Sequence, residues 1–183
     1  LIFFGYTKDP TKILLDFETS HQKTSYKTIV SKASDKKTKV LVVIPFKDSW
    51  DITASCLRGL ISQERKNTEL IIALVNNNSL MKSTIKKFEN LTQVNYSYKL
   101  YKLEDRGDFN YSRINNNAVR EVVKFEKNIS VIWFLNNDIS FVNKLILKKY
   151  LTFFNTTKNI GVLGSTLLYP DNKTIQHLFI SPG

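Results

Sequence analysis

The stretch Val40–Asp48, with the sequence VLVVIPFKD, decides the fold. Its first five residues are all apolar and mostly β-branched, which predicts a strand that is buried on both faces. The next segment, Asp51–Gln63, has apolar residues at helical spacing, and we expect these to face inward: Ile52, Cys56, Leu60 and Ile61. The sequence therefore predicts a buried strand, a short polar loop and an amphipathic helix.

The same alternation continues to the end of the chain. Further strands are predicted over Leu70–Val75, Val94–Leu103, Val131–Leu135 and Ile160–Leu168. Helices are predicted between them, over Met81–Leu91, Tyr111–Phe125 and Leu145–Phe154. In the second of these helices four residues should face inward: Ile114, Ala118, Val122 and Phe125. Apolar strands that alternate with amphipathic helices favour an α/β fold, in which a mostly parallel sheet has helices on both sides.

The first part of the chain does not follow this pattern. Residues 1–30 contain short apolar pieces without a sustained period, and Ser31–Lys39 is polar and rich in lysine. We therefore expect residues 1–39 to form an N-terminal extension and linker, and residues 40–183 to form the main domain. A chain of 183 residues with 42% hydrophobic content suits one core of ordinary size.

The composition also bears on location. No apolar stretch reaches the roughly 20 residues that cross a bilayer, and the start lacks the pattern of a secretory signal. Cys56 is the only cysteine, so no disulfide can form within the chain. These features predict a cytoplasmic protein.

The chain is strongly basic, with 27 Lys and Arg, 16 Asp and Glu, and a net charge of +11. This charge favours partners that carry phosphate, as well as anionic membrane surfaces such as the inner membrane, to which the protein could attach peripherally. The lysines are scattered along predicted helix faces, and no known nucleic-acid-binding motif accompanies them. We expect no nucleic-acid partner, and a basic α/β domain that binds nucleic acid remains the weaker alternative.

Three polar segments follow predicted strands: Pro45–Asp48, Asn76–Ser79 and Asn136–Asp138. The carboxyl ends of parallel strands meet at one edge of a sheet, where such folds bind ligands. No glycine-rich phosphate loop, Gly-x-Ser-x-Gly elbow or Cys-x-x-Cys pair is present. The candidate pocket is therefore formed by loop amides and acids.

These segments belong to a longer ordered set of motifs. The first group comprises Val40–Asp48 (VLVVIPFKD), Cys56-Leu57 with Leu60 and Gln63, and Val75–Ser79 (VNNNS). The second comprises Asp108–Asn116 (DFNYSRINN), Phe134–Asp138 (FLNND), Gly161–Gly164 (GVLG), Leu168–Asp171 (LYPD) and Ile175–His177 (IQH). In order and spacing, residues 40–183 resemble glycosyltransferase family 2, in the rhamnosyltransferase-like branch that builds bacterial surface polysaccharides.

The resemblance implies a GT-A fold, which is Rossmann-like, and an inverting transfer from a nucleotide-diphosphate sugar to a glycan or lipid-linked saccharide acceptor. Family members use a divalent cation, Mn or Mg, held by an acidic element after an apolar strand. Here that element is Asn136–Asp138, so Asp138 and Asn136 are the expected metal ligands. An amide ligand such as Asn136 brings no charge, which implies a weaker site. Considered alone, the segment could also be a simple strand-ending turn.

The resemblance also assigns donor-binding positions, and the expected set is Pro45, Phe46, Lys47, Asp48, Asn76, Asn78, Asn115, Asn116, Asn137 and Asp138. Asn76 stands where the family usually has an acid, and its amide oxygen can still accept a hydrogen bond from a base. Phe46 could equally be a core residue at the end of its strand. Arg106, Arg113 and His177 are candidates for contact with the diphosphate or the acceptor, although exposed arginines and a structural histidine are the alternatives.

An inverting transfer also needs a carboxylate that removes the proton from the acceptor hydroxyl. In the family this base lies beyond the position of Gly183, so the resemblance implies a fold that is incomplete at its C-terminus, with no catalytic residue within the chain. We expect such a fragment to bind donor and to transfer poorly. The alternative is a non-catalytic module that binds a nucleotide sugar.

Overall fold

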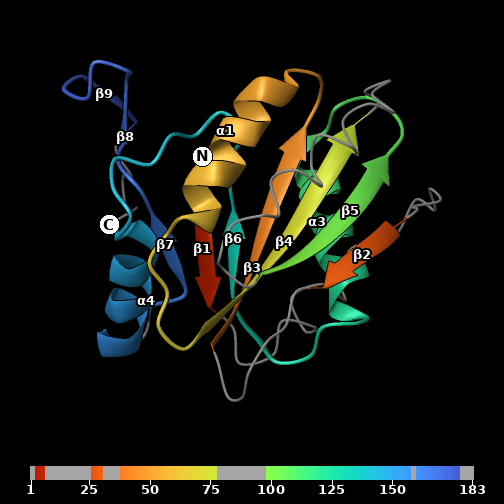
Figure 1. The fold of residues 1–183 in the computed structure, drawn as a ribbon, viewed down its shortest axis with the longest axis horizontal. Helices are drawn as coiled ribbons and strands as arrows, with labels where there is room; N and C mark the ends of the chain where they lie inside the picture. Colours follow the sequence, from red (N-terminus) through yellow and green to blue (C-terminus); the bar gives the residue numbers. More distant parts are fainter. Residues whose placement is uncertain (1–2, 7–25, 31–37, 78–97, 158–159, 178–183) are drawn as a thin grey trace.

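A computed structural model of the chain describes residues 3–6, 26–30, 38–77, 98–157 and 160–177. Within these residues the strands are β1 (Phe3–Tyr6), β2 (Tyr26–Val30), β3 (Thr38–Phe46), β4 (Thr68–Asn77), β5 (Tyr98–Asp105), β6 (Ile129–Phe134), β7 (Val162–Gly164), β8 (Leu167–Leu168) and β9 (Ile175–His177). The helices are α1 (Trp50–Ile61), α3 (Tyr111–Val123) and α4 (Ile146–Thr156). A seven-stranded sheet has the order β2-β5-β4-β3-β6-β1-β7, and β8 pairs with β9 separately (Figure 1).

The centre of the sheet consists of four parallel strands in the order β5-β4-β3-β6. Residues Val40–Ile44 of β3 lie between β4 and β6 and have no exposed surface. Alternate side chains of β3 enter two different cores, because successive residues of a strand point to opposite faces of the sheet. The prediction of an α/β fold with a mostly parallel sheet is therefore confirmed.

Helices cover both faces of this sheet. The core on one face includes apolar residues of α1 and α4, and the core on the other face includes Ile114, Ala118, Val119 and Val122 of α3. Figure 1 shows α3 on the far side of β4 and β5. No helix among the described residues is both long and apolar enough to cross a bilayer.

The structure corrects several sequence-based details. Ile52 is 51% exposed, because the buried face of α1 is centred on Thr53, Leu57 and Leu60. Phe125 is 50% exposed, because α3 ends at Val123 and its helical spacing does not extend further. The strand predicted over 160–168 is two short strands, β7 and β8. The helix predicted over 81–91 lies outside the described residues.

The sheet also includes strands from the predicted N-terminal extension. Strand β2 pairs antiparallel with β5 at one edge, and β1 lies between β6 and β7, antiparallel to both. The sheet therefore contains strands from both sides of the boundary that the sequence predicts near residue 40.

One stripe of α1 is joined to the segment that follows β6. The buried amide of Gln63 donates to the carbonyl oxygen of Asn143 at 3.0 Å and accepts from the backbone N–H of Leu147 at 3.2 Å. One turn earlier, Gly59 faces the ring of Phe141, which in turn packs against Trp133. The end of α1 therefore fixes both the segment that leads into α4 and the start of α4.

A charged cluster lies near the amino ends of the parallel strands. Glu126 is 6% exposed and accepts hydrogen bonds from Lys39 at 3.0 Å, Lys99 at 2.9 Å and the Tyr101 hydroxyl at 2.8 Å. Burial would raise the pKa of Glu126, but the bonds from Lys99, Tyr101 and Lys39 outweigh it and hold the pKa below its usual value. The cluster therefore stabilises the fold above the ordinary carboxyl pKa, and this contribution is lost as the pH falls through the lowered value.

We expect Glu126→Gln to reduce the free energy of unfolding at pH 7 by about 1–3 kcal/mol, since Lys39 loses its carboxylate and Lys99 keeps only its pair with Glu69. Urea unfolding at pH 7 and pH 4 should also show that the variant loses less stability on acidification than the native chain. The control is Glu121→Gln, which breaks the more exposed pair with Lys124 and should cost less than about 0.5 kcal/mol. Equal losses in the two variants would contradict this role for the cluster.

Gly59→Ala provides a second test of the fold. A Cβ at this position would lie 2.8 Å from Cδ2 of Phe141, so overpacking of about 1–3 kcal/mol should exceed the gain of about 1 kcal/mol in helix propensity. The matched control is Gly161→Ala, where a Cβ meets nothing within 4 Å and stability should change by less than about 0.5 kcal/mol. Thermal unfolding that shows Gly59→Ala to be stabilised would refute the close approach.

Candidate functional site

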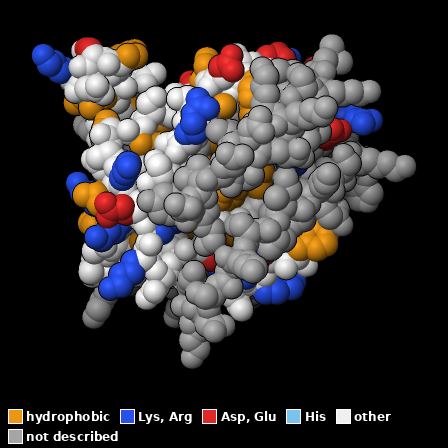
Figure 2. Space-filling view, in the orientation of Figure 1, with side chains coloured by type: hydrophobic (Ala, Val, Ile, Leu, Met, Phe, Trp, Pro, Cys, Tyr) orange, Lys and Arg blue, Asp and Glu red, His pale blue; other side chains and the backbone are white. Residues whose placement is uncertain are grey.

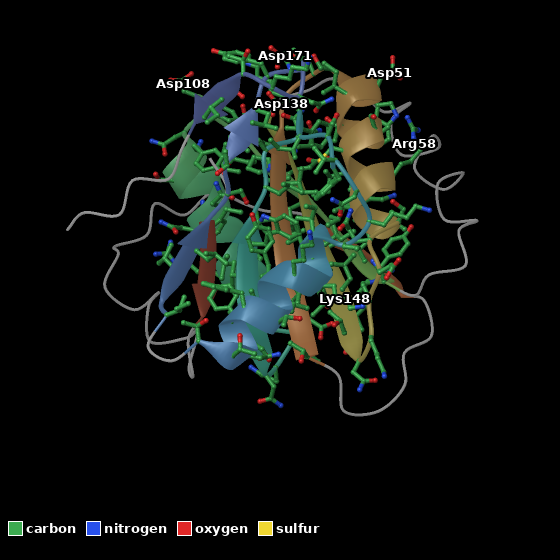
Figure 3. All side chains as sticks on the ribbon, turned by 90° about the vertical axis from the view of Figure 1, so that its left-hand side faces the viewer. Asp51, Arg58, Asp108, Asp138, Lys148 and Asp171 are labelled. Carbon is green, nitrogen blue, oxygen red and sulfur yellow. The ribbon has the colours of Figure 1, made fainter. Side chains whose placement is uncertain are left out.

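The carboxyl ends of the four parallel strands meet at one edge of the sheet, and three of the described loops begin there: residues 47–49, 106–110 and 135–145. Figure 3 shows the labelled side chains of Asp138, Asp108 and Asp51 toward this edge, each from a different loop or helix start. The structure therefore brings together the predicted segments Pro45–Asp48, Asn76 and Asn136–Asp138. Asn78 lies outside the described residues.

The loop after β3 divides into a buried and an exposed half. Pro45 and Phe46 are buried, and the Phe46 ring lies 6.1 Å from that of Trp50 in the core. Phe46 is thus a core residue, the alternative that the sequence left open. Lys47, Asp48 and Ser49 are exposed, so they are the residues of this loop that a ligand can reach.

The backbone of this loop is unusual. Asp48 and Ser49 have φ angles of 55° and 50°, a left-handed conformation that residues other than glycine adopt at an energetic cost. Ser49 is also the residue before α1, and its side chain makes no capping hydrogen bond. The surrounding structure holds this turn, which sets the direction in which Lys47 and Asp48 leave the sheet.

A buried polar network connects the ends of β4 and β5. Asn77 is completely buried, and its amide donates to Asp105 at 2.6 Å and to the carbonyl oxygen of Gly107 at 3.2 Å. The Arg113 guanidinium binds both carboxylate oxygens of Asp105, at 2.7 and 3.0 Å, and the carbonyl oxygen of Asp108 at 2.7 Å. This network fixes the loop that joins β5 to α3.

The Arg113 guanidinium, a candidate for contact with the diphosphate or the acceptor, is engaged within the protein. Its charge is already matched by the Asp105 carboxylate in a bidentate pair, and its side chain is 22% exposed. Arg106 differs, because its side chain is 76% exposed and lies 3.7 Å from Glu104. Of the two arginines, Arg106 is the more exposed.

The start of α3 carries the next predicted residues. The side chain of Asn110 caps the helix by accepting from the backbone N–H of Arg113 at 2.9 Å. Asn115 is buried and donates to the carbonyl oxygen of Tyr111 at 2.8 Å, whereas Asn116 is half-buried. Within the described residues, the side-chain oxygens of Asn77 and Asn115 have no hydrogen-bond partner.

The loop after β6 is attached to α1 and leaves its acid exposed. The amide of Asn137 donates to the Thr53 hydroxyl at 2.9 Å, and the Cys56 thiol donates to the carbonyl oxygen of Asn136 at 3.5 Å. Burial is the main cause that raises the pKa of Cys56 to about 12, and the nearby charge of Asp138 acts in the same direction. Cys56 is thus a buried thiol, and the exposed Asp138 carboxylate stands beside it at the sheet edge.

This loop offers limited ligands to a metal ion. No group of three or more His, Cys, Asp or Glu side chains that could hold a metal occurs in the part of the chain that the structure describes. Mg²⁺ is often held by one or two carboxylates together with substrate phosphates, rather than by a complete set of protein ligands. Of the two expected metal ligands, Asp138 is exposed and Asn136 is half-buried. His177 lies in β9 opposite Leu167, and its side chain is outside the described part.

Parts of the chain are similar to known proteins. No protein-family model matches the chain. The chain is 30% identical over 145 residues to the O-antigen biosynthesis protein RfbC of Myxococcus xanthus, a match that covers 79% of the chain and 10% of that protein. The chain resembles an O-antigen biosynthesis protein. Its matched part spans about a tenth of that relative's length.

Among solved structures, S. aureus TarS 1–349 is similar with a TM-score of 0.42 and 20% sequence identity. That similarity covers 64% of this chain and 32% of the other.

Sequence reasoning missed the roles of Asn77 and Asp105. A signal was present, because the two residues occupy paired positions at the ends of neighbouring strands. The predicted strand stopped at Leu103, however, which left Asp105 outside the sheet and hid its alignment with Asn77. The network that they form with Arg113 holds the loop that joins β5 to α3 at the edge of the sheet.

We expect Asp105→Asn to destabilise the chain by about 2–4 kcal/mol, since the new amide group would face the donors of Arg113 or Asn77 and leave a largely buried guanidinium unpaired. The adjacent substitution Glu104→Gln is the control, because its pair with Arg106 is exposed and contributes less than about 0.5 kcal/mol. Urea unfolding at pH 7 measures both. A loss below about 1 kcal/mol in the free energy of unfolding for Asp105→Asn would mean that the network does not stabilise the loop that joins β5 to α3.

Proposed function

We propose that the chain is the donor-binding part of a glycosyltransferase domain of the GT-A type. It would take a nucleotide-diphosphate sugar as donor and serve an inverting transfer to a glycan or lipid-linked acceptor in surface polysaccharide biosynthesis. The observation that carries the proposal is the exposed Asp138 carboxylate, which follows a central parallel strand beside two other polar loops. The similarity to an O-antigen biosynthesis protein and the ordered motifs support the same class of reaction.

In this proposal each loop has a separate task. Asn76, half-buried at the end of β4 and in register with Phe46 of β3, accepts a hydrogen bond from the base. Lys47 and Asp48 meet the polar edges of the nucleoside, and Lys47 adds positive charge for the phosphates. Asn116, which is half-buried near the start of α3, lines the donor, and the buried Asn115 supports this part of the helix through its bond to the carbonyl oxygen of Tyr111.

Asp138 and Asn136 have the task of holding the diphosphate. When the sugar leaves, negative charge grows on the nucleoside diphosphate, and a divalent cation bound there would stabilise that charge. Asn137 and Asn136 keep the loop on α1 through Thr53 and Cys56, so that the Asp138 carboxylate stays directed into solvent at the edge. The proposal covers donor binding and assigns the deprotonation of the acceptor to no residue of this chain.

The single carboxylate of this loop favours one alternative, a non-catalytic module that binds a nucleotide sugar without a metal ion. The two functions differ in their dependence on the cation. In the transferase, nucleotide binding is strengthened by Mn²⁺ or Mg²⁺ through Asp138. In the alternative, neither the cation nor Asp138 affects binding.

Calorimetric titration of the chain with UDP, dTDP, GDP and CDP, each with and without Mn²⁺, tests the proposal. We expect one nucleotide to bind in a Mn²⁺-dependent manner, and Asp138→Asn to weaken that binding by about 1.4 kcal/mol or more, which is tenfold. The matched control is Asp51→Asn, which removes an exposed carboxylate in the first turn of α1 and should change affinity less than about twofold.

Two results would contradict the proposal. Nucleotide binding whose affinity is unchanged by Mn²⁺ and by Asp138→Asn would favour the non-catalytic module. If the folded chain binds none of the four nucleotides at millimolar concentration, its role as a donor-binding part is wrong.

A further inference from the structure

The stretch between Asp138 and Asp171 has an unusual charge pattern. It contains four lysines, Lys144, Lys148, Lys149 and Lys158, and no acidic residue. A solvated helix that serves only as a cover for the core usually mixes both signs of charge. This segment is therefore locally cationic in a way that the donor site does not use.

Helix α4, within this stretch, has an apolar inner face and an outer face that is both basic and partly apolar. Its inner face packs Leu147, with Ile146, Tyr150, Leu151 and Phe154, against the core beside α1. Its outer face and the residues just before it carry both lysines and apolar side chains. Those apolar side chains are exposed: Val142 by 65%, Leu145 by 36% and Phe153 by 46%.

The helical spacing puts the outer residues on one side. The outer residues are separated by three or one positions, so they lie within less than half of the helix circumference. They are Leu145, Lys148, Lys149, Thr152 and Phe153. No ion pair within the described residues involves Lys144, Lys148 or Lys149. Figure 2 shows basic and apolar side chains mixed along the left-hand flank, the side on which Figure 1 places α4.

We propose that this face, formed by Val142, Lys144, Leu145, Lys148, Lys149 and Phe153, docks the protein on an anionic lipid surface. Lysines attract the negative headgroups, and each adds roughly a fivefold gain in binding at the surface. The three apolar side chains enter the boundary between headgroups and acyl chains, as they do in helices that lie in the plane of a membrane. Lysine stems extend past apolar neighbours, so both kinds of contact can form together.

The bordering residues do not cancel this charge. Glu64 is exposed and adjacent, since its backbone N–H donates to the carbonyl oxygen of Lys144 at 2.8 Å. The exposed Lys66 lies two residues further on and offsets the charge of Glu64. The like charge also argues against a symmetric contact between two copies of this face, because three lysines would oppose three others.

The placement of the face matters for the candidate site. Figure 3 looks onto α4, with Lys148 on the near side and Asp138, Asp108 and Asp171 toward the upper edge. A lipid surface on α4 would therefore leave the loop edge uncovered and beside the membrane. The membrane contact itself does not rest on the proposed function. Only the suggestion that an acceptor attached to lipid reaches the edge from this side depends on it.

Co-sedimentation with phosphatidylcholine vesicles, with and without phosphatidylglycerol, tests the docking face. We expect binding only to the anionic vesicles, and a loss of binding as NaCl is added. The double variant Lys148→Gln/Lys149→Gln should bind about 25-fold more weakly. Phe153→Ser should weaken binding separately, and that loss should persist at a salt concentration at which the lysine contribution is screened.

The matched control is Lys124→Gln/Lys127→Gln, which removes the same charge from exposed positions at the end of α3, on the other face of the sheet. It should bind within about twofold of the native chain. Circular dichroism establishes that each variant is folded. Equal binding to neutral vesicles, equal losses in the two double variants, or self-association that the α4 substitutions abolish would each overturn the proposal.

Nucleotide titration of the same variants separates the two proposals. Lys148 and Lys149 lie outside the loops of the candidate site, so their substitution should leave nucleotide affinity unchanged. If no variant and no native chain binds nucleotide but anionic vesicles still bind through α4, the proposed function fails and the docking face stands.

Discussion

The complete burial of β3 is the constraint on which the rest of the structure depends. Val40–Ile44 lies between two parallel neighbours and under helices on both faces, so every side chain of this run must be apolar and every backbone group must pair within the sheet. Once this strand is placed, the ends of β4 and β6 are aligned beside it. The loops that follow these strands therefore lie at the same edge of the sheet.

The parts of the fold that depend on local pattern could be predicted from the sequence. Runs such as Val40–Ile44 and Leu70–Val75 are short and apolar throughout, which indicates buried strands. Their alternation with amphipathic segments indicated the parallel sheet. Prediction failed where a residue's position depends on a helix boundary, as at Phe125, or on the exact orientation of a helix, as at Ile52. Neither quantity is set by hydrophobic spacing alone.

The candidate site shows the same division. The sequence placed Asn76 and Asp138 at strand ends, because the order of polar loops follows from the order of strands. It could not show that Arg113 is engaged by Asp105, since that pair depends on how the loop after β5 returns to its own strand. As a result, Arg113 supports the loop that joins β5 to α3. The exposed charged groups of the candidate site include Lys47, Asp48, Arg106, Asp108 and Asp138.

The stripe on α1 has a consequence for how this region can vary. Four contacts lie along a single line of the helix and the residues just after it. They join Thr53 to Asn137, Cys56 to Asn136, Gly59 to Phe141 and Gln63 to Asn143. Each contact presumes the same number of residues between the end of β6 and the start of α4. Inserting or deleting one residue there would break the later contacts at once, whereas many replacements of exposed residues would break none. The length of this loop should therefore be inherited more strictly than its composition.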